Sequence, residues 1–143
     1  MFIGEYHHSM DAKNRIIIPS KFREELTNTF ILTRGVDKCI SIYTKEHFEK
    51  IVENLRRLPE YSKKNRAYKQ MILSSSINVE TDSMGRIQIP QFLKTILPEK
   101  ECTFVGIDDH IEIWSSTVWE KHYNDIIENI EDISEEIGEH FNS

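Results

Sequence analysis

An internal repeat is the feature that most constrains the fold of this 143-residue chain. The stretch DAKNRIIIP begins at Asp11 and the stretch DSMGRIQIP begins at Asp82, which gives an offset of 71 residues. With that offset held and no gap introduced, 12 of the 40 positions from 11 to 50 are identical to their counterparts. Self-similarity at a fixed offset indicates repeated supersecondary units. A duplication is the simplest explanation, and each copy is predicted to fold as one such unit.

Each copy is predicted to open with two short strands joined by a tight turn at the repeated aspartate. Asp11 and Asp82 suit the start of a turn because an aspartate carboxylate accepts backbone N–H bonds from residues two positions on. Asn14 and Gly85 share the later position of the turn. Asn and Gly are the residues that best tolerate a positive φ, so both copies meet one backbone requirement. These four residues are therefore predicted to shape two hairpin tips.

After the tip, each copy continues as a helical turn, two strands and a longer helix. Apolar residues at i, i+4 spacing predict the helical turns over 22–26 and 93–97. Thr44 and the stretch 115–117 are predicted N-caps of the longer helices, and Thr117 and Glu120 have the spacing of a capping box. The strand-like runs are 30–34, 39–43, 102–105 and 111–114.

The chain divides into four predicted segments, which are a first repeat over 1–50, a basic and largely helical connector over 51–75, a second repeat over 76–119 and an acidic amphipathic helix over 120–143. In the last segment, apolar residues recur at alternating steps of four and three from Trp119 to Ile137. This stripe fits a helix packed on its own domain as well as one that contacts a neighbouring subunit. We expect subunit contact, because the stripe is long for a helix that covers only its own domain.

The net charge of −6 hides an asymmetry between the two halves of the chain. Residues 1–75 hold 14 Lys and Arg against 9 Asp and Glu, whereas residues 76–143 hold 4 against 15. Charge segregated in this way can present a basic face to a polyanion while the acidic segment stays in solvent. The overall negative charge therefore does not exclude nucleic acid as a partner.

Motifs of enzymes and cofactor sites are absent from the sequence. It holds no Gly-rich phosphate loop and no His-x-x-x-His pair, and Cys39 and Cys102 lie far apart without metal-ligand spacing. No window approaches the roughly 20 apolar residues of a membrane span, and no export signal is recognisable. We expect a cytoplasmic protein that is not an enzyme, uses no cofactor or metal and does not associate with the membrane.

The repeated arginines are the best candidates for nucleic-acid contact. Arg15 and Arg86 are predicted to project from the ends of rigid hairpins, and a guanidinium suits bidentate contact with phosphate or with the O6/N7 edge of guanine. Lys13 adds a second basic residue to the first tip, where the second has Met84. The main contact is therefore predicted on the first copy. The predicted DNA-binding residues are Lys13, Arg15, Lys21 and Arg23 in the first copy and Arg86 in the second.

The opening MFIGEY, the stretch DAKNRIIIPSKFRE and the second motif DSMGRIQIP closely resemble the MraZ family of bacterial regulators of the division and cell wall gene cluster. The resemblance covers both repeats. It implies an α+β fold of the AbrB-like superfamily, in which two swapped-hairpin repeats form a pseudo-symmetric β-barrel-like core with flanking helices. The family's basic motif residues fall on Lys13, Arg15 and Arg86. Asn14 stands where the family usually has glycine.

The resemblance also implies a function. Family members are DNA-binding transcription factors that form closed rings, bind direct repeats upstream of their own operon and usually repress it, so a nucleoid location is expected. Several identical tips on one ring, facing successive repeats of double-stranded DNA, would convert weak contacts into strong binding. The alternative is a protein-interaction module similar to the antitoxins of the same superfamily, which holds a partner with its acidic C-terminal helix.

Overall fold

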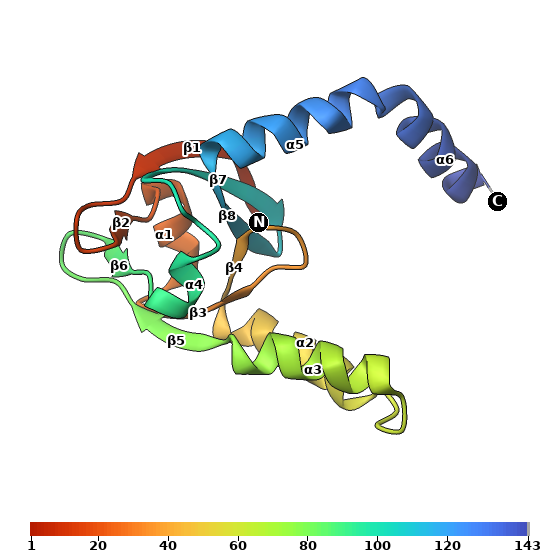
Figure 1. Cartoon of the computed structure of the whole chain (residues 1–143), viewed down its shortest axis with the longest axis horizontal. Coiled ribbons are helices and arrows are strands. Elements are labelled where there is room, and N and C mark those ends of the chain that lie inside the picture. The colour runs from red at the N-terminus through yellow and green to blue at the C-terminus, as the bar shows by residue number, and fades with distance from the viewer. Residues whose placement is uncertain (143) are drawn as a thin grey trace.

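The computed structural model describes residues 1–142, which form an α+β fold whose elements recur in the same order in the two copies (Figure 1). The first copy contains β1 (Phe2–Ser9), β2 (Arg15–Ile17), α1 (Ser20–Leu26), β3 (Thr29–Arg34), β4 (Ile40–Tyr43), α2 (Lys45–Arg56) and α3 (Lys63–Ser74). The second copy contains β5 (Ile77–Glu80), β6 (Arg86–Gln88), α4 (Gln91–Lys94), β7 (Glu101–Asp108), β8 (His110–Ser115), α5 (Ser116–Glu128) and α6 (Ile130–Asn142).

The two copies exchange strands. The first strand of each copy, β1 or β5, pairs antiparallel with the third strand of the other copy, β7 or β3. This exchange builds a six-stranded sheet in the order β1-β7-β8-β4-β3-β5, and β2 and β6 form a separate two-stranded sheet across the copies. Neither copy can complete its sheet without the other.

A pseudo-twofold axis relates the copies. In the β2–β6 ladder Ile16 lies opposite Ile87, and in the β4–β8 ladder Ser41 lies opposite Glu112. Both pairs join positions that are 71 residues apart, as a twofold axis through the centres of these ladders requires. The axis therefore passes between the two hairpins and between the two halves of the large sheet.

The main hydrophobic core lies between the large sheet and the layer formed by β2, β6, α1 and α4. Side chains alternate along the strands, so Ile111 and Ile113 of β8 face this core while Trp114 packs with Trp119 of α5 in a second cluster. The repeated apolar positions are at most 1% exposed and make up the centre of the core; these are Ile16, Ile18, Leu26, Ile40 and Ile42 with Ile87, Ile89, Leu97, Ile111 and Ile113.

The large sheet is open. Its edge strands, β1 and β5, do not pair with each other within residues 1–142, so the expected barrel-like core is not confirmed. The α+β class and the two repeats are as predicted. Among the described residues, no helix combines the length and the apolar character that crossing a membrane requires.

The helices depart from expectation in three places. The predicted long C-terminal helix is broken at Asn129, whose amide side chain donates to the Asp125 carbonyl at 2.8 Å in competition with regular helical bonding. The capping box at Thr117 does not form, because α5 already begins at Ser116 and the Thr117 hydroxyl donates to Glu99. In the second copy α4 covers only Gln91–Lys94. The cap at Thr44 is confirmed, since its hydroxyl accepts from the His47 amide at 3.2 Å.

Candidate nucleic-acid interface

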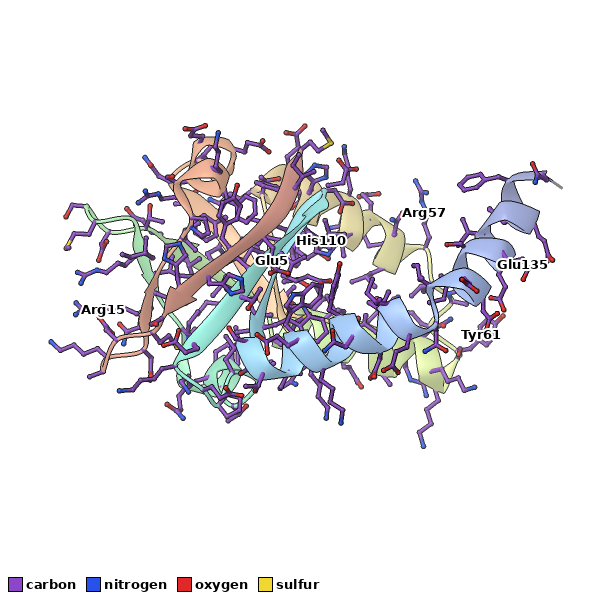
Figure 2. The ribbon with its side chains drawn as sticks, turned by 90° about the horizontal axis from the view of Figure 1, so that it is seen from above. Glu5, Arg15, Arg57, Tyr61, His110 and Glu135 are labelled. Atoms are coloured by element: carbon purple, nitrogen blue, oxygen red, sulfur yellow. The ribbon has the colours of Figure 1, made fainter. Side chains whose placement is uncertain are left out.

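The two hairpin tips lie side by side at one end of the molecule. The β2–β6 ladder places Arg15 opposite Gln88 and Ile17 opposite Arg86, so one turn enters the short ladder at each of its two ends. Figure 1 shows both turns extending from the end of the molecule that lies opposite α3 and α6. In Figure 2, Arg15 lies at the far end from Arg57, Tyr61 and Glu135. The tips and the projecting helices thus form separate surfaces.

The Asp11 carboxylate organises the first tip. One oxygen, Oδ1, accepts hydrogen bonds from the backbone amides of Lys13 and Arg15, each at 2.9 Å. The other oxygen, Oδ2, accepts from Nε of Arg15 at 2.7 Å. The turn is closed by the Asn14 amide, which donates to the Asp11 carbonyl at 3.0 Å. Asp11 therefore fixes both the turn and the start of the Arg15 side chain.

The second tip repeats these contacts. Oδ1 of Asp82 accepts from the amides of Met84 and Arg86, each at 2.9 Å, and Oδ2 accepts from Nε of Arg86 at 2.8 Å. The Gly85 amide donates to the Asp82 carbonyl at 2.9 Å. The two tips are therefore equivalent in backbone and in the placement of their arginines.

The positive-φ residues of the turns also join the copies. Asn14 has a φ of 60° and Gly85 has a φ of 76°. The Asn14 carbonyl accepts from the Ile89 amide, and the Gly85 carbonyl accepts from the Ile18 amide, each at 2.9 Å. Since each carbonyl is aimed by the left-handed conformation of its residue, the turn geometry and the pairing of the copies depend on one another.

Arg23 gives the second turn surroundings that the first turn lacks. A Cβ built on Gly85 would collide with the Arg23 guanidinium, whose Nη1 reaches the Met84 carbonyl at 3.4 Å. The counterpart of Arg23 is Lys94, which instead donates to the Leu97 carbonyl at 2.7 Å. Because Lys94 is held at the Leu97 carbonyl, the first turn has room for the side chain of Asn14. Asparagine is also a residue that tolerates the left-handed region.

The tip carboxylates stay charged well below neutral pH. Hydrogen bonds from the Arg15 amide, followed by those from its side chain and from Lys13, hold the pKa of Asp11 below its ordinary value of 3.8. The equivalent bonds from Arg86 and Met84 lower the pKa of Asp82. Within residues 1–142, the terminal guanidinium nitrogens of Arg15 and Arg86 make no hydrogen bond, and Nε alone serves the ion pair. Those terminal nitrogens can serve an external acceptor such as a phosphate.

The other predicted site residues occupy different surroundings. Lys13 is exposed on the first tip, and its counterpart Met84 is 61% exposed on the second. Arg23 is half-buried against the second turn. Lys21 lines a surface pocket together with Met1 and Ile3 at the start of β1, whereas the first tip follows the end of that strand. The structure therefore gathers Lys13, Arg15, Arg23 and Arg86 about the tips and leaves Lys21 outside this group.

Gln88 is a tip residue that the sequence did not single out. Its Nε2 donates to the Lys13 carbonyl at 3.2 Å, so the second copy supports the first tip through a side chain. The sequence offers one sign of this role: Gln88 is polar, whereas its counterpart in the first copy, Ile17, is apolar. Without knowledge of the β2–β6 ladder, that difference could not be interpreted.

The described residues contain no group of three or more His, Cys, Asp and Glu side chains arranged to hold a metal ion. Cys39 and Cys102 are buried, and their burial raises the pKa of each thiol, that of Cys102 to about 11. Both thiols are therefore protonated at neutral pH, which makes them poor nucleophiles and poor metal ligands.

The fold and the tips define a class, namely a duplicated α+β protein with exchanged strands whose paired Asp–Arg turns lie together at one end. The chain belongs to the MraZ family: the family described as "MraZ protein, putative antitoxin-like" matches residues 1–71 and again residues 72–138. The two matches follow the internal repeat and cover nearly the whole chain. MraZ is a regulator-like family.

Proposed function

We propose that this protein is a sequence-specific DNA-binding transcriptional regulator. It represses the division and cell wall gene cluster by binding direct repeats upstream of its own operon. The observation that carries this proposal is the pair of Asp–Arg tips at one end of the molecule, each with an arginine held by Nε and with its terminal nitrogens open to a ligand.

The first tip makes the main contact in this proposal. Its Asp11 charge offsets Arg15, so Lys13 supplies the net positive charge that draws the tip to phosphates. The second tip has Met84 in place of that lysine, and Asp82 offsets Arg86 in the same way. The residues of the first turn are therefore net positive and those of the second turn are close to neutral, so the second tip takes its extra positive charge from Arg23 of α1.

Self-association raises the affinity in the same proposal. A ring presents several identical first tips, and direct repeats in the DNA present several identical boxes, so each bound tip increases the effective concentration of the next. The α5–α6 segment offers exposed apolar side chains for contact between subunits, including Ile127 and Ile137, which are 47% and 50% exposed.

The test is a salt-titrated binding assay on the DNA upstream of the operon, with one box and with several boxes. Arg15→Ala should abolish operator binding and leave the oligomer intact, whereas the matched variant Arg86→Ala should have the smaller effect. Because Arg15 also bonds Asp11, Lys13→Ala serves as a second variant that leaves the carboxylate contacts in place. Full binding by Arg15→Ala would contradict the assignment of the site.

The second candidate function is a protein-interaction module similar to antitoxins, in which the acidic α6 holds a partner. Two observations favour it: the exposed isoleucines of α6 and the antitoxin likeness in the family's description. This candidate predicts a stable heteromeric complex in pull-down experiments and little salt-sensitive affinity for DNA. Tight, salt-dependent binding to several boxes would count against it.

A further inference from the structure

Two helical arms of opposite charge project from the molecule. We define the basic arm as residues 56–69, from the end of α2 into α3, and the acidic arm as residues 125–142, from the end of α5 through α6. The basic arm holds six Lys and Arg and one acidic residue. The acidic arm holds seven Asp and Glu and neither Lys nor Arg. In Figure 1 the two arms leave the sheet at separate places, so they do not neutralise each other within one chain.

The acidic arm carries an uncovered apolar stripe. Figure 1 shows α6 extending away from the sheet, and no residue of α6 is buried. Its substantial packing within the described residues is against α5 alone. Large apolar side chains remain 40% to 79% exposed along this arm; these are Ile127, Ile130, Ile133, Ile137 and Phe141.

The internal repeat shows how different the two arms are. In the first copy α3 folds back beside α2, and its Ile72 is buried, with its carbonyl accepting from the Thr33 hydroxyl of β3 at 3.1 Å. Lys69 ties this hairpin by donating to the Leu58 carbonyl at 3.1 Å. In the second copy α6 follows α5 directly and does not fold back. The last helix of the first copy, α3, is therefore packed against the rest of its own copy, whereas the last helix of the second copy, α6, is not.

Several charged side chains of both arms have no hydrogen-bond or ion-pair partner among residues 1–142. Arg57, Lys63 and Lys64 are exposed and make no side-chain hydrogen bond or ion pair within residues 1–142. The same holds for the acidic residues of α6, including Glu131, Glu135 and Glu136. Figure 2 shows Arg57 and Tyr61 of the basic arm and Glu135 of the acidic arm, all far from Arg15.

We propose that the acidic arm of one chain docks on the basic arm of a second, identical chain. The isoleucine stripe packs against the apolar side chains of the basic arm, where Tyr61 is 88% and Tyr68 is 43% exposed. Carboxylates beside the stripe, such as Glu131 and Glu136, face the basic residues of that arm and steer the encounter. Like charge disfavours the pairing of two acidic arms.

This docking is head to tail, because the two surfaces are different parts of the chain. Each chain offers one arm of each kind, so the same contact repeats from chain to chain. It closes into a ring when the rotation between neighbouring chains allows it. The inference rests on the self-association in the proposed function and names the surfaces that produce it. It leaves both hairpin tips uncovered, since the arms lie away from them.

Reversal of charge on each arm, followed by mixing, tests the docking. The first variant carries Arg57→Glu, Lys63→Glu and Lys64→Glu, and the second carries Glu131→Lys, Glu135→Lys and Glu136→Lys. Light scattering should give each variant alone the protomer mass of 16.9 kDa. An equimolar mixture should form complexes heavier than either variant alone, since the unchanged acidic arm of the first variant then meets the unchanged basic arm of the second. The control is Lys38→Glu, Lys50→Glu and Lys100→Glu, which makes the same charge change off the basic arm and should keep the wild-type mass.

Three results would overturn the docking: a single arm variant that keeps the wild-type mass, a mixture that stays monomeric, or a wild-type protein that is itself monomeric. A basic-arm variant that keeps its mass but loses DNA affinity would assign that arm to DNA instead. Binding to DNA that carries one box does not require self-association. This measurement therefore distinguishes failure of the docking from failure of the proposed function. If the variants still bind it in a salt-dependent way, the tips retain their function and only the docking is wrong.

Discussion

The two hairpin tips are built from the same contacts and present different surfaces. Both aspartates accept the same three hydrogen bonds, at lengths that agree within 0.1 Å, and in both turns a backbone carbonyl accepts a hydrogen bond from an amide of the other copy. Outside these contacts the tips diverge, with Lys13 exposed on one and Met84 on the other. The shared contacts thus fix one backbone geometry in both tips, while the exposed side chains at Lys13 and Met84 give the two tips different surfaces.

The largest effect is expected at the turn residue with positive φ. Gly85→Ala should lower the free energy of unfolding by about 1–3 kcal/mol, because alanine is strained at this φ. The new methyl group also displaces Arg23. Asn14→Ala should lower the free energy of unfolding by less, about 1 kcal/mol, because alanine tolerates the left-handed region less well than asparagine and no steric clash is added. Denaturant unfolding measures both losses.

The double variant Gly85→Ala with Arg23→Ala separates the two causes. Removal of the guanidinium should recover the steric part of the loss and leave the backbone strain. Equal losses for Gly85→Ala and Asn14→Ala would show that Arg23 does not distinguish the two turns.

An exchange of charge between the tips should transfer DNA affinity from one to the other. Lys13→Ala should reduce the slope of log K against log salt by about 0.9 for each tip on the DNA, and Met84→Lys should increase it if the second tip approaches the phosphates. Fluorescence anisotropy at several salt concentrations measures both slopes. An unchanged slope for Lys13→Ala would remove Lys13 from the interface, while the same result for Met84→Lys would place the second tip away from DNA.

The tip carboxylates should contribute to acid stability. Their pKa values are lower in the folded protein than the ordinary value of 3.8, so their stabilisation is complete above that value and is lost as the pH falls through the folded pKa. Asp11→Asn and Asp82→Asn, together, should flatten the fall in the free energy of unfolding below about pH 4. Unfolding curves from pH 6 to pH 3 would refute this if wild type and double variant ran parallel.

The smallest effect should come from His110, whose counterpart in the first copy is Cys39. Burial alone would lower the pKa of His110, but hydrogen bonds with Glu112 at 3.3 Å and Asp109 at 2.7 Å outweigh it and raise this pKa. The stabilisation is therefore complete below the ordinary value of 6.5 and is lost as the pH rises through the folded pKa. His110→Gln should abolish this dependence, as measured by unfolding between pH 5 and pH 9; Cys39→Ser should retain it.

Local features of the fold were predictable from the sequence. Asp11 and Asn14 satisfy the chemistry of one tight turn within four residues, and the strands around them follow from alternation over short runs. The break at Asn129 was not predicted, because the stripe of isoleucines continues across it with helical spacing. Only the bond from its side chain to Asp125 shows why regular bonding stops there.

Tertiary features were less accessible. Alternation in β1 would suit pairing with a strand of either copy, so the exchange of strands came from the family resemblance and not from the residues themselves. The direction of the α1 side chains depends on packing, so the sequence alone does not distinguish Lys21 from Arg23, which contacts the second turn. Gln88 belongs to the first tip only because β2 and β6 pair.

The exchange of strands has a consequence for the synthesis of the protein on the ribosome. Phe2 pairs with Asp108, so the first strand emerges more than 100 residues before the end of its partner. At a translation rate of about 5–20 residues per second, β1 waits roughly 5–20 seconds for β7. Ile16 and Ile18 likewise wait for β6, and the nascent first copy exposes apolar strands throughout this time. Since both copies lie on one polypeptide, the missing strands arrive in equal number and at high local concentration, and the newly made chain does not have to capture them from a second molecule.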